Sequence, residues 1–372
     1  MHPASPLRLL IVLPSWVGDV VMATPTIRRI RNAYPGIFIG ALVKPGINQL
    51  LSDNTLFDEL HIATPSGMMA TKKTASKIRP RQYDTALLLT NSFSTALTTR
   101  LAFIPRRIGY NRDTRAMLLT DPIAPPRNPD RSWKLTPAID YYWNLASHLL
   151  DQDPVDWSIH TPTNSKALPL ALPSDVYMEL GFTDDDQAKA ADILDRAHIS
   201  SHTKYAILNP GGNNPAKRWP IDRFAQLADH LHTKHNLRVL INGSPNESDL
   251  CDQIIAASKA EPVSLPALGN TLGALKPIIA GAKILITNDT GPRHIAGALG
   301  TPLITLFGPT DPRWTTIPTR PLPNGSPSET IIVADESLPS DQSANDHPDR
   351  CAIEHIDYEA VRDATDSMLG SS

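Results

Sequence analysis

Three short loops of the sequence combine glycine with polar or charged residues in an order that could do chemistry. They are LPSWVGD at residues 13–19, NPGGNNPAKRWP at 209–220 and ITNDTGPRHIAGALG at 286–300. Each begins in or directly after an apolar run typical of a buried strand, so we expect each to lie where a strand gives way to a helix. In parallel α/β sheets, ligands bind at such loops. The three loops therefore predict the functional residues.

The first loop delivers a carboxylate, Asp19, at the start of an expected helix. Gly18 can take backbone angles that other residues avoid, so we expect a tight turn and a helix beginning near Asp19 or Val20. The carboxylate can cap that helix, as Asp does well, or act as a general base toward a substrate hydroxyl. The sequence here contains neither GxGxxG nor GxxxxGK[ST], which excludes the dinucleotide and P-loop fingerprints.

The second loop predicts an anion-binding turn. Gly211, Gly212 and Asn213 offer backbone N–H groups after a strand, and Lys217 adds a mobile positive charge. That combination suits a phosphate. The alternative is an ordinary turn, because loops rich in glycine and asparagine are usually no more than that.

The third loop predicts an anion site at the start of a helix. Asp289, Thr290 and Gly291 form the turn after a strand, and Pro292 stands where a first helical residue should. Backbone amides at a helix N-terminus bind anions without a metal. His294 follows in the first turn and is either a half-buried histidine with satisfied hydrogen bonds or a ligand contact.

Length and patterning indicate a globular protein of two α/β domains. The chain has 372 residues, 41% of them apolar and 20% charged, about twice the length of a typical domain. Short apolar runs alternate with helical patterns in both halves, which indicates βαβ units and parallel sheets. A proline-rich, polar segment near 153–175 separates the two sets. A second such segment, 318–350, predicts an extended loop before the last helix.

Cysteine count and hydropathy favour the cytoplasm. Cys251 and Cys351 are the two cysteines, with no zinc spacing and no disulfide framework, so a reducing compartment is expected. No apolar run approaches the roughly 18–20 residues of a membrane span. The run after Arg8, of about six residues, is too short for a secretory signal and predicts a buried first strand.

Charge is distributed unevenly along the chain. Residues 1–150 contain 18 Lys and Arg against 9 Asp and Glu, a net +9, whereas the remainder contains 17 against 29, a net −12. A basic first half favours an anionic partner. The alternative is a solvated charge distribution without functional meaning.

Three ordered motifs resemble glycosyltransferase family 9, the family of the ADP-heptose:lipopolysaccharide heptosyltransferases. They are PSWVGDVVMATPTIRRI, PAKRWP and NDTGPRHIAGALGTPLITLFGPTDP, and the first two look most like the heptosyltransferase II type. NSFSTAL followed by IPRRIGY, and GSPNES, agree, so the resemblance covers nearly the whole chain. It implies an α/β GT-B fold of two Rossmann-like parallel-sheet domains facing an interdomain cleft. The acceptor domain would be 1–175 and the donor domain 176–350, with a helix in 351–372 packing back on the first domain.

The resemblance also implies roles for single residues. Asp19 matches the proposed catalytic base, and Glu247 would accept hydrogen bonds from the ribose of the donor. The donor-binding residues would be Gly211, Gly212, Asn213, Lys217, Glu247, Asp289, Thr290, Gly291 and His294.

The implied reaction is an inverting transfer of a heptose from ADP-L-glycero-D-manno-heptose to a sugar hydroxyl of the lipopolysaccharide inner core. The carboxylate takes the proton as the new bond forms, and Lys217 with the helix N-terminus stabilises the leaving diphosphate. We expect no metal and no cofactor, since the nucleotide-sugar is a substrate. The acidic triplets at 151–153 and 184–186 are therefore assigned no ion.

The basic half would meet the anionic acceptor, because an inner core carries carboxylates and phosphates. The expected acceptor contacts are Ser15, Asn91, Ser92, Arg106 and Arg107, with Arg79, Arg81, Arg112 and Arg115 as further candidates. We expect a cytoplasmic protein that associates transiently with the inner face of the cytoplasmic membrane, and no nucleic-acid partner.

Three alternatives stay open at this point. The donor can be another nucleotide-sugar, since Asn270 stands where a relative can carry a larger apolar residue near the base. An epimerase on the same fold would need a second acid–base set and no acceptor. A non-catalytic module would bind the nucleotide-sugar without transfer.

Overall fold

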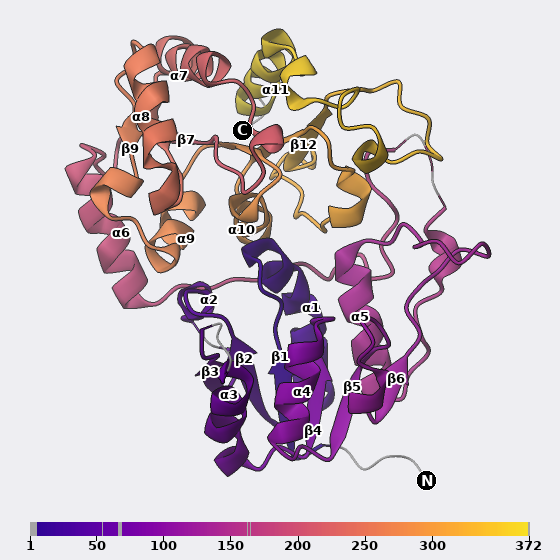
Figure 1. The fold of residues 1–372 in the computed structure, drawn as a ribbon. Helices are drawn as coiled ribbons and strands as arrows, with labels where there is room; N and C mark the ends of the chain where they lie inside the picture. Colours follow the sequence, from indigo (N-terminus) through magenta and orange to yellow (C-terminus); the bar gives the residue numbers. More distant parts are fainter. Residues whose placement is uncertain (1–5, 54, 66–68, 162, 164, 371–372) are drawn as a thin grey trace. The chain divides into compact units, whose positions relative to one another are not determined.

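The computed structural model describes residues 6–53, 55–65, 69–161, 163 and 165–370. The chain divides into two compact units (Figure 1). Unit 1 comprises residues 1–161 and 169–176, and unit 2 comprises 162–168 and 177–372. The segment that we expected to link two domains is thus shared between them. Among the described residues, no helix is long and apolar enough to span a membrane.

Unit 1 is built on a parallel sheet of six strands in the order β3-β2-β1-β4-β5-β6. The strands are β1 (Arg8–Val12), β2 (Phe38–Val43), β3 (Glu59–Ile62), β4 (Thr85–Leu88), β5 (Arg106–Tyr110) and β6 (Asp121–Ile123). The helices are α1 (Val17–Ala33), α2 (Ile47–Leu50), α3 (Ala70–Ile78), α4 (Phe93–Leu101) and α5 (Ala138–Leu149).

The apolar runs of unit 1 form strands because both faces of its sheet are covered. Leu10 and Val12 of β1 pack in a core cluster with residues of α3 and α4. Their neighbours Leu9 and Ile11 point to the opposite face and are also fully buried. A parallel sheet buried on both faces needs such continuous apolar strands, and α1 packs against α5 just as α3 packs against α4.

Unit 2 repeats this architecture with the order β12-β11-β10-β7-β8-β9, again all parallel. The strands are β7 (Tyr205–Asn209), β8 (Arg238–Ile241), β9 (Val263–Ser264), β10 (Leu285–Asn288), β11 (Leu303–Phe307) and β12 (Glu329–Val333). The helices are α6 (Asp184–Arg196), α7 (Ile221–His235), α8 (Ser248–Ala257), α9 (Leu272–Ala280), α10 (Gly291–Leu299) and α11 (Tyr358–Gly370).

Strand order reverses at one point in each sheet. In unit 1 the chain moves outward from β1 through β2 to β3 and then returns to β4 beside β1; in unit 2 the same happens between β7 and β10. The loops at the carboxyl ends of these adjacent strands separate there and leave a crevice, which is where open α/β sheets bind ligands. All three chemistry-bearing loops of the sequence follow β1, β7 or β10.

The last helix belongs to unit 2 and packs in its core, and the expected contact with the first domain stays a prediction. Val361 and Met368 of α11 are buried in the core cluster of unit 2 together with Trp219 and Phe224. The Trp219 Nε1–H donates to the Ile356 carbonyl at 2.9 Å, just before the helix begins. An apolar face and a buried indole therefore attach this segment to α7 and its neighbours.

The segment 318–350 is more ordered than an extended loop. It contains β12, which pairs along its full length with β11, for instance Thr305 opposite Ile331. The sequence TIIV carried a strand signal that the surrounding proline, serine and aspartate obscured. As an edge strand with half-buried residues, β12 also lacks the long apolar run of a central strand.

Candidate functional site

The glycine loop after β7 is fixed by a carboxylate from the next strand's loop. Glu247 accepts hydrogen bonds from the Gly212 N–H at 2.7 Å and from the N–H and Oγ of Ser244 at 2.8 Å each. Burial raises the pKa of Glu247, but these hydrogen bonds outweigh it and the net shift is downward, so the group is ionised. A Cβ on Gly211 would lie 2.6 Å from both carboxylate oxygens. A side chain at position 211 would therefore force the Glu247 carboxylate to move away from the loop.

Two side chains that we did not single out from the sequence complete this loop. Asn288, fully buried at the end of β10, donates to the Pro210 carbonyl at 2.7 Å. Arg218 donates from Nε and Nη2 to the Gly212 carbonyl at 3.0 and 2.8 Å. Because the carbonyls of Pro210 and Gly212 accept these hydrogen bonds, the backbone conformation of the loop is fixed. Asn213, at its tip, is exposed.

Lys217 and Asp289 form the centre of the candidate donor site. The Lys217 ammonium lies 3.1 Å from Asp289 Oδ2, and the Arg293 guanidinium lies 3.6 Å from Oδ1. Burial raises the pKa of Asp289, but the charges of Arg293 and Lys217 more than compensate and lower it. Arg293 is itself fully buried and paired with Glu329 at 2.7 Å. The site thus holds a permanent carboxylate between two cations, of which Lys217 is the more exposed.

His294 is a neutral imidazole in this environment. Burial, followed by repulsion from the Arg293 charge, lowers its pKa to about 3. Its Nδ1 is buried and has no hydrogen-bond partner among the described residues. A buried polar atom without a partner is uncommon and calls for an explanation, and a ligand at this end of α10 would supply one. The structural alternative, a histidine with satisfied hydrogen bonds, does not hold for this atom.

The N-terminus of α10 follows directly. Thr290 is its N-cap in extended backbone conformation, and Gly291 is the first helical residue. The Thr290 hydroxyl does not cap the helix; it accepts from Asn209 Nδ2 at 2.9 Å. Asn209 in turn accepts a hydrogen bond from Asn242 at 2.7 Å. Together with Asn288, these side chains form a row of buried amides across the ends of β10, β7 and β8. Sequence patterns did not predict this row. The backbone N–H groups in the first turn of α10 form the positive end of the helix dipole, and they lie at the same edge of the sheet.

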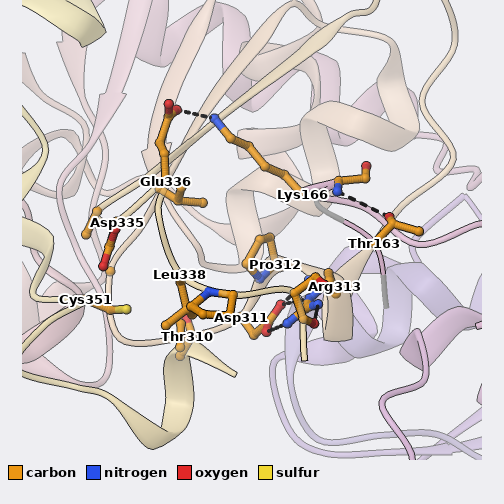
Figure 2. A pocket seen from close by; sticks show the side chains of 17 residues that line it. Thr163, Lys166, Thr310, Asp311, Pro312, Arg313, Asp335, Glu336, Leu338 and Cys351 are labelled. Carbon is orange, nitrogen blue, oxygen red and sulfur yellow. Dashed lines mark hydrogen bonds and ion pairs between the residues drawn. The ribbon is translucent and has the colours of Figure 1, made fainter. Parts of the chain in front are cut away.

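A cavity opens beside these residues at the ends of β11 and β12, with a volume of about 90 Å³ (Figure 2). Arg313 on its wall binds Asp311 through two hydrogen bonds of 2.9 and 2.6 Å, and Lys166 pairs with Glu336 at 2.6 Å. The Thr310 hydroxyl lies 3.5 Å from Asp289 Oδ2, so the cavity adjoins the Lys217–Asp289 pair. The loop after β11 is therefore part of the same edge.

In unit 1, Asp19 lies at the switch point after β1. The helix α1 begins at Val17 with Trp16 as its N-cap, two residues earlier than expected, and Gly18 is helical. Both the special turn at Gly18 and the cap role for Asp19 are therefore wrong. Instead, the hydroxyl of the buried Tyr142, from α5, donates a hydrogen bond to the Asp19 carboxylate. Burial and this carboxylate raise the pKa of Tyr142 well above its usual value, so it stays a donor.

The loop after β4 lies at the same edge as Asp19. Asn91 accepts hydrogen bonds from Arg115 and from the Tyr141 hydroxyl, both at 3.3 Å. Ser92 is the exposed N-cap of α4 and accepts from the Thr95 N–H at 3.4 Å, which is a structural role. Arg115 is fully buried and also donates to the Thr90 carbonyl. It therefore fixes the backbone of this loop from the interior of unit 1.

Arg106 and Arg107, two of the expected acceptor contacts, lie at the edge of the sheet opposite to Asp19. They begin β5, in register with Thr85 and Ala86 at the amino end of β4. Arg107 is buried and donates to the carbonyls of residues 104, 105 and 118, while Arg106 pairs with Asp121. Both are structural in this arrangement.

The arginines before β4 also lie at the amino edge. Arg81 pairs with Glu59 at 2.6 Å, and Arg79 stacks over Phe103. By contrast, Arg112 follows β5 at the carboxyl edge, where its guanidinium stacks 3.9 Å from the centre of the Trp133 ring. Ser15, half-buried in the loop before α1, lies at that edge as well.

The acidic triplet at 184–186 has a structural explanation. Thr183 caps α6, and Asp186 closes the capping box with the Thr183 N–H at 3.0 Å. Asp185 pairs with Lys189 one turn on. These carboxylates stabilise the N-terminus of a helix.

Comparison with known proteins agrees with this architecture. The sequence model of glycosyltransferase family 9 (heptosyltransferase) matches residues 71–346. The chain belongs to glycosyltransferase family 9. It is 29% identical over 318 residues to lipopolysaccharide heptosyltransferase 2 of Escherichia coli K12, covering 83% of this chain and 85% of that protein. Membership of this family makes the chain a glycosyltransferase and not an epimerase.

Two solved structures share the fold across nearly the whole chain. The structure of E. coli ADP-heptose lps heptosyltransferase II has a TM-score of 0.75 at 24% identity and covers 97% of this chain and 98% of its own. The family 9 glycosyl transferase from Veillonella parvula has a TM-score of 0.77 at 18% identity, covering 98% and 97%. With two parallel sheets of Rossmann order, the fold is GT-B, as the motifs predicted.

Proposed function

We propose that this family 9 transferase moves a heptose from ADP-L-glycero-D-manno-heptose to a sugar hydroxyl of the lipopolysaccharide inner core, with inversion at the anomeric carbon. The similarity to lipopolysaccharide heptosyltransferase 2 over most of both chains supports the donor and the acceptor class. Within unit 2, one observation carries the proposal: Lys217 and the N-terminus of α10 meet at the β7/β10 switch point, beside a glycine loop that Glu247 holds in place.

The donor diphosphate would bind at that point. Lys217 would give its charge to the phosphate oxygens while Asp289 keeps it in position, and the α10 amides would add hydrogen bonds. Negative charge grows on the leaving diphosphate as the glycosidic bond breaks. Fixed cations and dipoles aimed at it bind the transition state more strongly than the ground state. His294, being neutral, would offer its Nδ1 to the nucleotide-sugar.

Asp19 would act as the general base. An acceptor hydroxyl is not ionised at neutral pH, so a carboxylate must take its proton as the new bond forms, which contributes roughly 10²–10⁴-fold. Tyr142 would orient that carboxylate through its hydrogen bond. The proposal requires Asp19 to reach the acceptor oxygen when both substrates are bound.

We propose that the reaction uses no metal and no cofactor. Lys217 and the α10 N-terminus bring positive charge to the place where the diphosphate would lie. These groups would perform the charge stabilisation that a divalent cation performs in other transferases.

The acceptor would be held at the carboxyl edge of unit 1. Ser15, Asn91 and Ser92 lie on its loops, and Arg112 gives this edge a cation that can pair with a carboxylate or phosphate. The basic balance of residues 1–150 supports an anionic acceptor. A lipid-linked acceptor would bring the enzyme transiently to the inner face of the cytoplasmic membrane.

Titration calorimetry with ADP, UDP and GDP, each with and without magnesium, tests the donor assignment. We expect binding of ADP alone, unchanged by magnesium. Transfer is then assayed with ADP-heptose and an inner-core acceptor. Preference for UDP or GDP would move the proposal to another nucleotide-sugar, and a requirement for magnesium would contradict the metal-free mechanism.

A further inference from the structure

Two histidines of α7 and one aspartate of α11 converge on a single point of unit 2. His230 Nε2 lies 2.8 Å and His235 Nε2 lies 2.6 Å from the same carboxylate oxygen, Asp366 Oδ1. The other carboxylate oxygen is paired with Lys234 at 2.6 Å. The family's reaction explains none of these residues, and none belongs to the loops at the carboxyl edge of the sheet.

The three side chains offer a ligand set that differs from an ordinary ion pair. One ligand atom of each residue lies within 4.8 Å of the other two, and within the described residues this is the one such group of three. The side chains are 16%, 18% and 22% exposed, so solvent ions can reach them while the surrounding helices hold them. Two imidazoles and a carboxylate are ligands that zinc and its neighbouring transition metals favour, whereas magnesium and calcium prefer oxygen alone.

We propose that His230, His235 and Asp366 bind a divalent transition-metal ion of the zinc class, which cross-links α11 to the C-terminal end of α7. The ion would take one Nε2 from each histidine and Oδ1 from the aspartate, and water would complete a tetrahedral site. Its role would be structural, fixing the last helix to unit 2, and it does not rest on the proposed donor or acceptor.

Two of the three donor separations are close to those of a tetrahedral site. Metal–nitrogen bonds of about 2.0–2.1 Å place tetrahedral donors about 3.3 Å apart, slightly more than the present 2.6 and 2.8 Å. A small outward movement of these partly exposed side chains provides that space. Lys234 can keep its bond to Oδ2, because that oxygen is not required as a ligand.

The electrostatics of the site also favour a cation. His235 is the last residue of α7, so the carbonyl end of the helix dipole lies at the cluster. Asp366 brings a carboxylate to the same point, within 2.8 Å of both imidazoles. A metal ion would replace the protons that now join the imidazoles to this carboxylate.

Zinc titration of the full-length chain at pH 7.5 tests the proposal. The protein is purified through a tag without histidine and stripped with a chelator, and calorimetry is run with ZnCl₂ and separately with MgCl₂. We expect one saturable zinc equivalent per chain, no magnesium binding at this cluster and a higher Tm with zinc. Cobalt should give the visible absorption of a tetrahedral site.

Matched variants locate the site. His230→Ala and His235→Ala should each weaken zinc binding by at least about 100-fold, since loss of a ligand costs more than loss of its hydrogen-bond partner. His232→Ala, on the same helix but outside the cluster, should bind as the original chain does. Asp366→Asn keeps the shape of the side chain and should lose the zinc-dependent rise in Tm while circular dichroism reports an unchanged fold.

Two results would overturn the proposal. One is the absence of a saturable zinc equivalent in the original chain. The other is binding that survives in His230→Ala, His235→Ala and Asp366→Asn, which would place the ion elsewhere. Either result would leave the cluster as a salt bridge between two helices.

Discussion

The carboxyl edges of the two sheets share one strand order but carry different chemistry. At the edge of unit 2, buried amides bond to one another and to the glycine loop, and Lys217 bonds to Asp289. At the edge of unit 1, a half-buried Asp19 is held by Tyr142 from a distant helix, and arginines shape the neighbouring loop. The fold thus provides two equivalent crevices, and the loop residues decide what each can do.

This difference suits the two roles that we propose for the edges, diphosphate binding in unit 2 and proton transfer in unit 1. Binding a diphosphate requires fixed positive charge and backbone amides, and unit 2 fixes them through many contacts. Proton transfer would require one carboxylate of the right orientation, and in unit 1 the buried Tyr142 hydroxyl donates to Asp19. Variants in the two edges should therefore separate binding from catalysis.

The largest effect is expected for Asp19→Asn. The variant keeps the shape of the side chain but loses its basicity, so kcat should fall by about 10²–10⁴-fold while ADP affinity stays unchanged. Asp53→Asn, an exposed change in the same unit, is the control. Turnover close to that of the original enzyme would remove Asp19 from the role of base.

Lys217→Ala should weaken both donor binding and turnover. Hydrogen bonds to charged groups contribute about 1.5–3 kcal/mol, or roughly 10–100-fold, and this charge would count most in the transition state. Calorimetry with ADP and steady-state kinetics measure the two effects. Lys189→Ala, on the surface of α6, should change neither. An unaltered Kd and kcat in Lys217→Ala would refute the phosphate contact.

Adjacent glycines give a matched test of the donor loop. Gly211→Ala places a Cβ 2.6 Å from the Glu247 carboxylate, whereas a Cβ on Gly212 meets nothing closer than 3.7 Å. We expect Gly211→Ala to cost about 1–3 kcal/mol of stability and to weaken ADP binding, with Gly212→Ala close to neutral in stability. Equal Tm values in the two variants would show that the loop is not held as described.

The neutral His294 predicts a pH dependence of stability. Its folded pKa of about 3 is below the usual 6.5, so the unfolded chain binds a proton that the folded chain does not. Stability should fall as the pH falls from 6.5 toward 3, by up to about 1.4 kcal/mol per pH unit from this group. In His294→Asn, denaturant unfolding at pH 6.5 and 4.5 should show a smaller loss. An identical loss would mean that other groups cause it.

The smallest effect is expected for Tyr142→Phe. One hydrogen bond contributes about 0.5–1.5 kcal/mol, so kcat should fall by a few-fold with ADP affinity unchanged. In the Asp19→Asn background the same change should have little further effect, because the two residues act together. Independent effects of the two substitutions would show that Tyr142 does not position the carboxylate.

Much of this architecture could be predicted from the sequence, since period-2 and period-3.6 apolar patterns are local. They indicated β1, β7, β10 and the helices that follow them, and the glycine and proline residues marked the loops. The same local logic failed for Gly18, which is helical, and for β12, whose strand signal is short and surrounded by proline and serine.

The motifs predicted Asp19, Lys217 and Asp289, but not the buried contacts that shape these sites and their neighbouring loops. Tyr142, Asn288 and Arg115 lie far along the chain from the groups that they contact, and no local pattern marks a buried amide or hydroxyl as a partner. Arg106 and Arg107 show the converse. Their charges suggested an acceptor site, but strand direction places them at the other edge.

The sequence by itself determined the element types, the parallel α/β class and the three loops that carry chemistry, because each depends on neighbours along the chain. Only the tertiary structure decided strand order, and strand order decides which loops share a crevice. It also decided that His230, His235 and Asp366 meet, since the packing of α11 on α7 brings together residues more than a hundred positions apart. Long-range packing, which no local period encodes, thus sets the partners of each functional group.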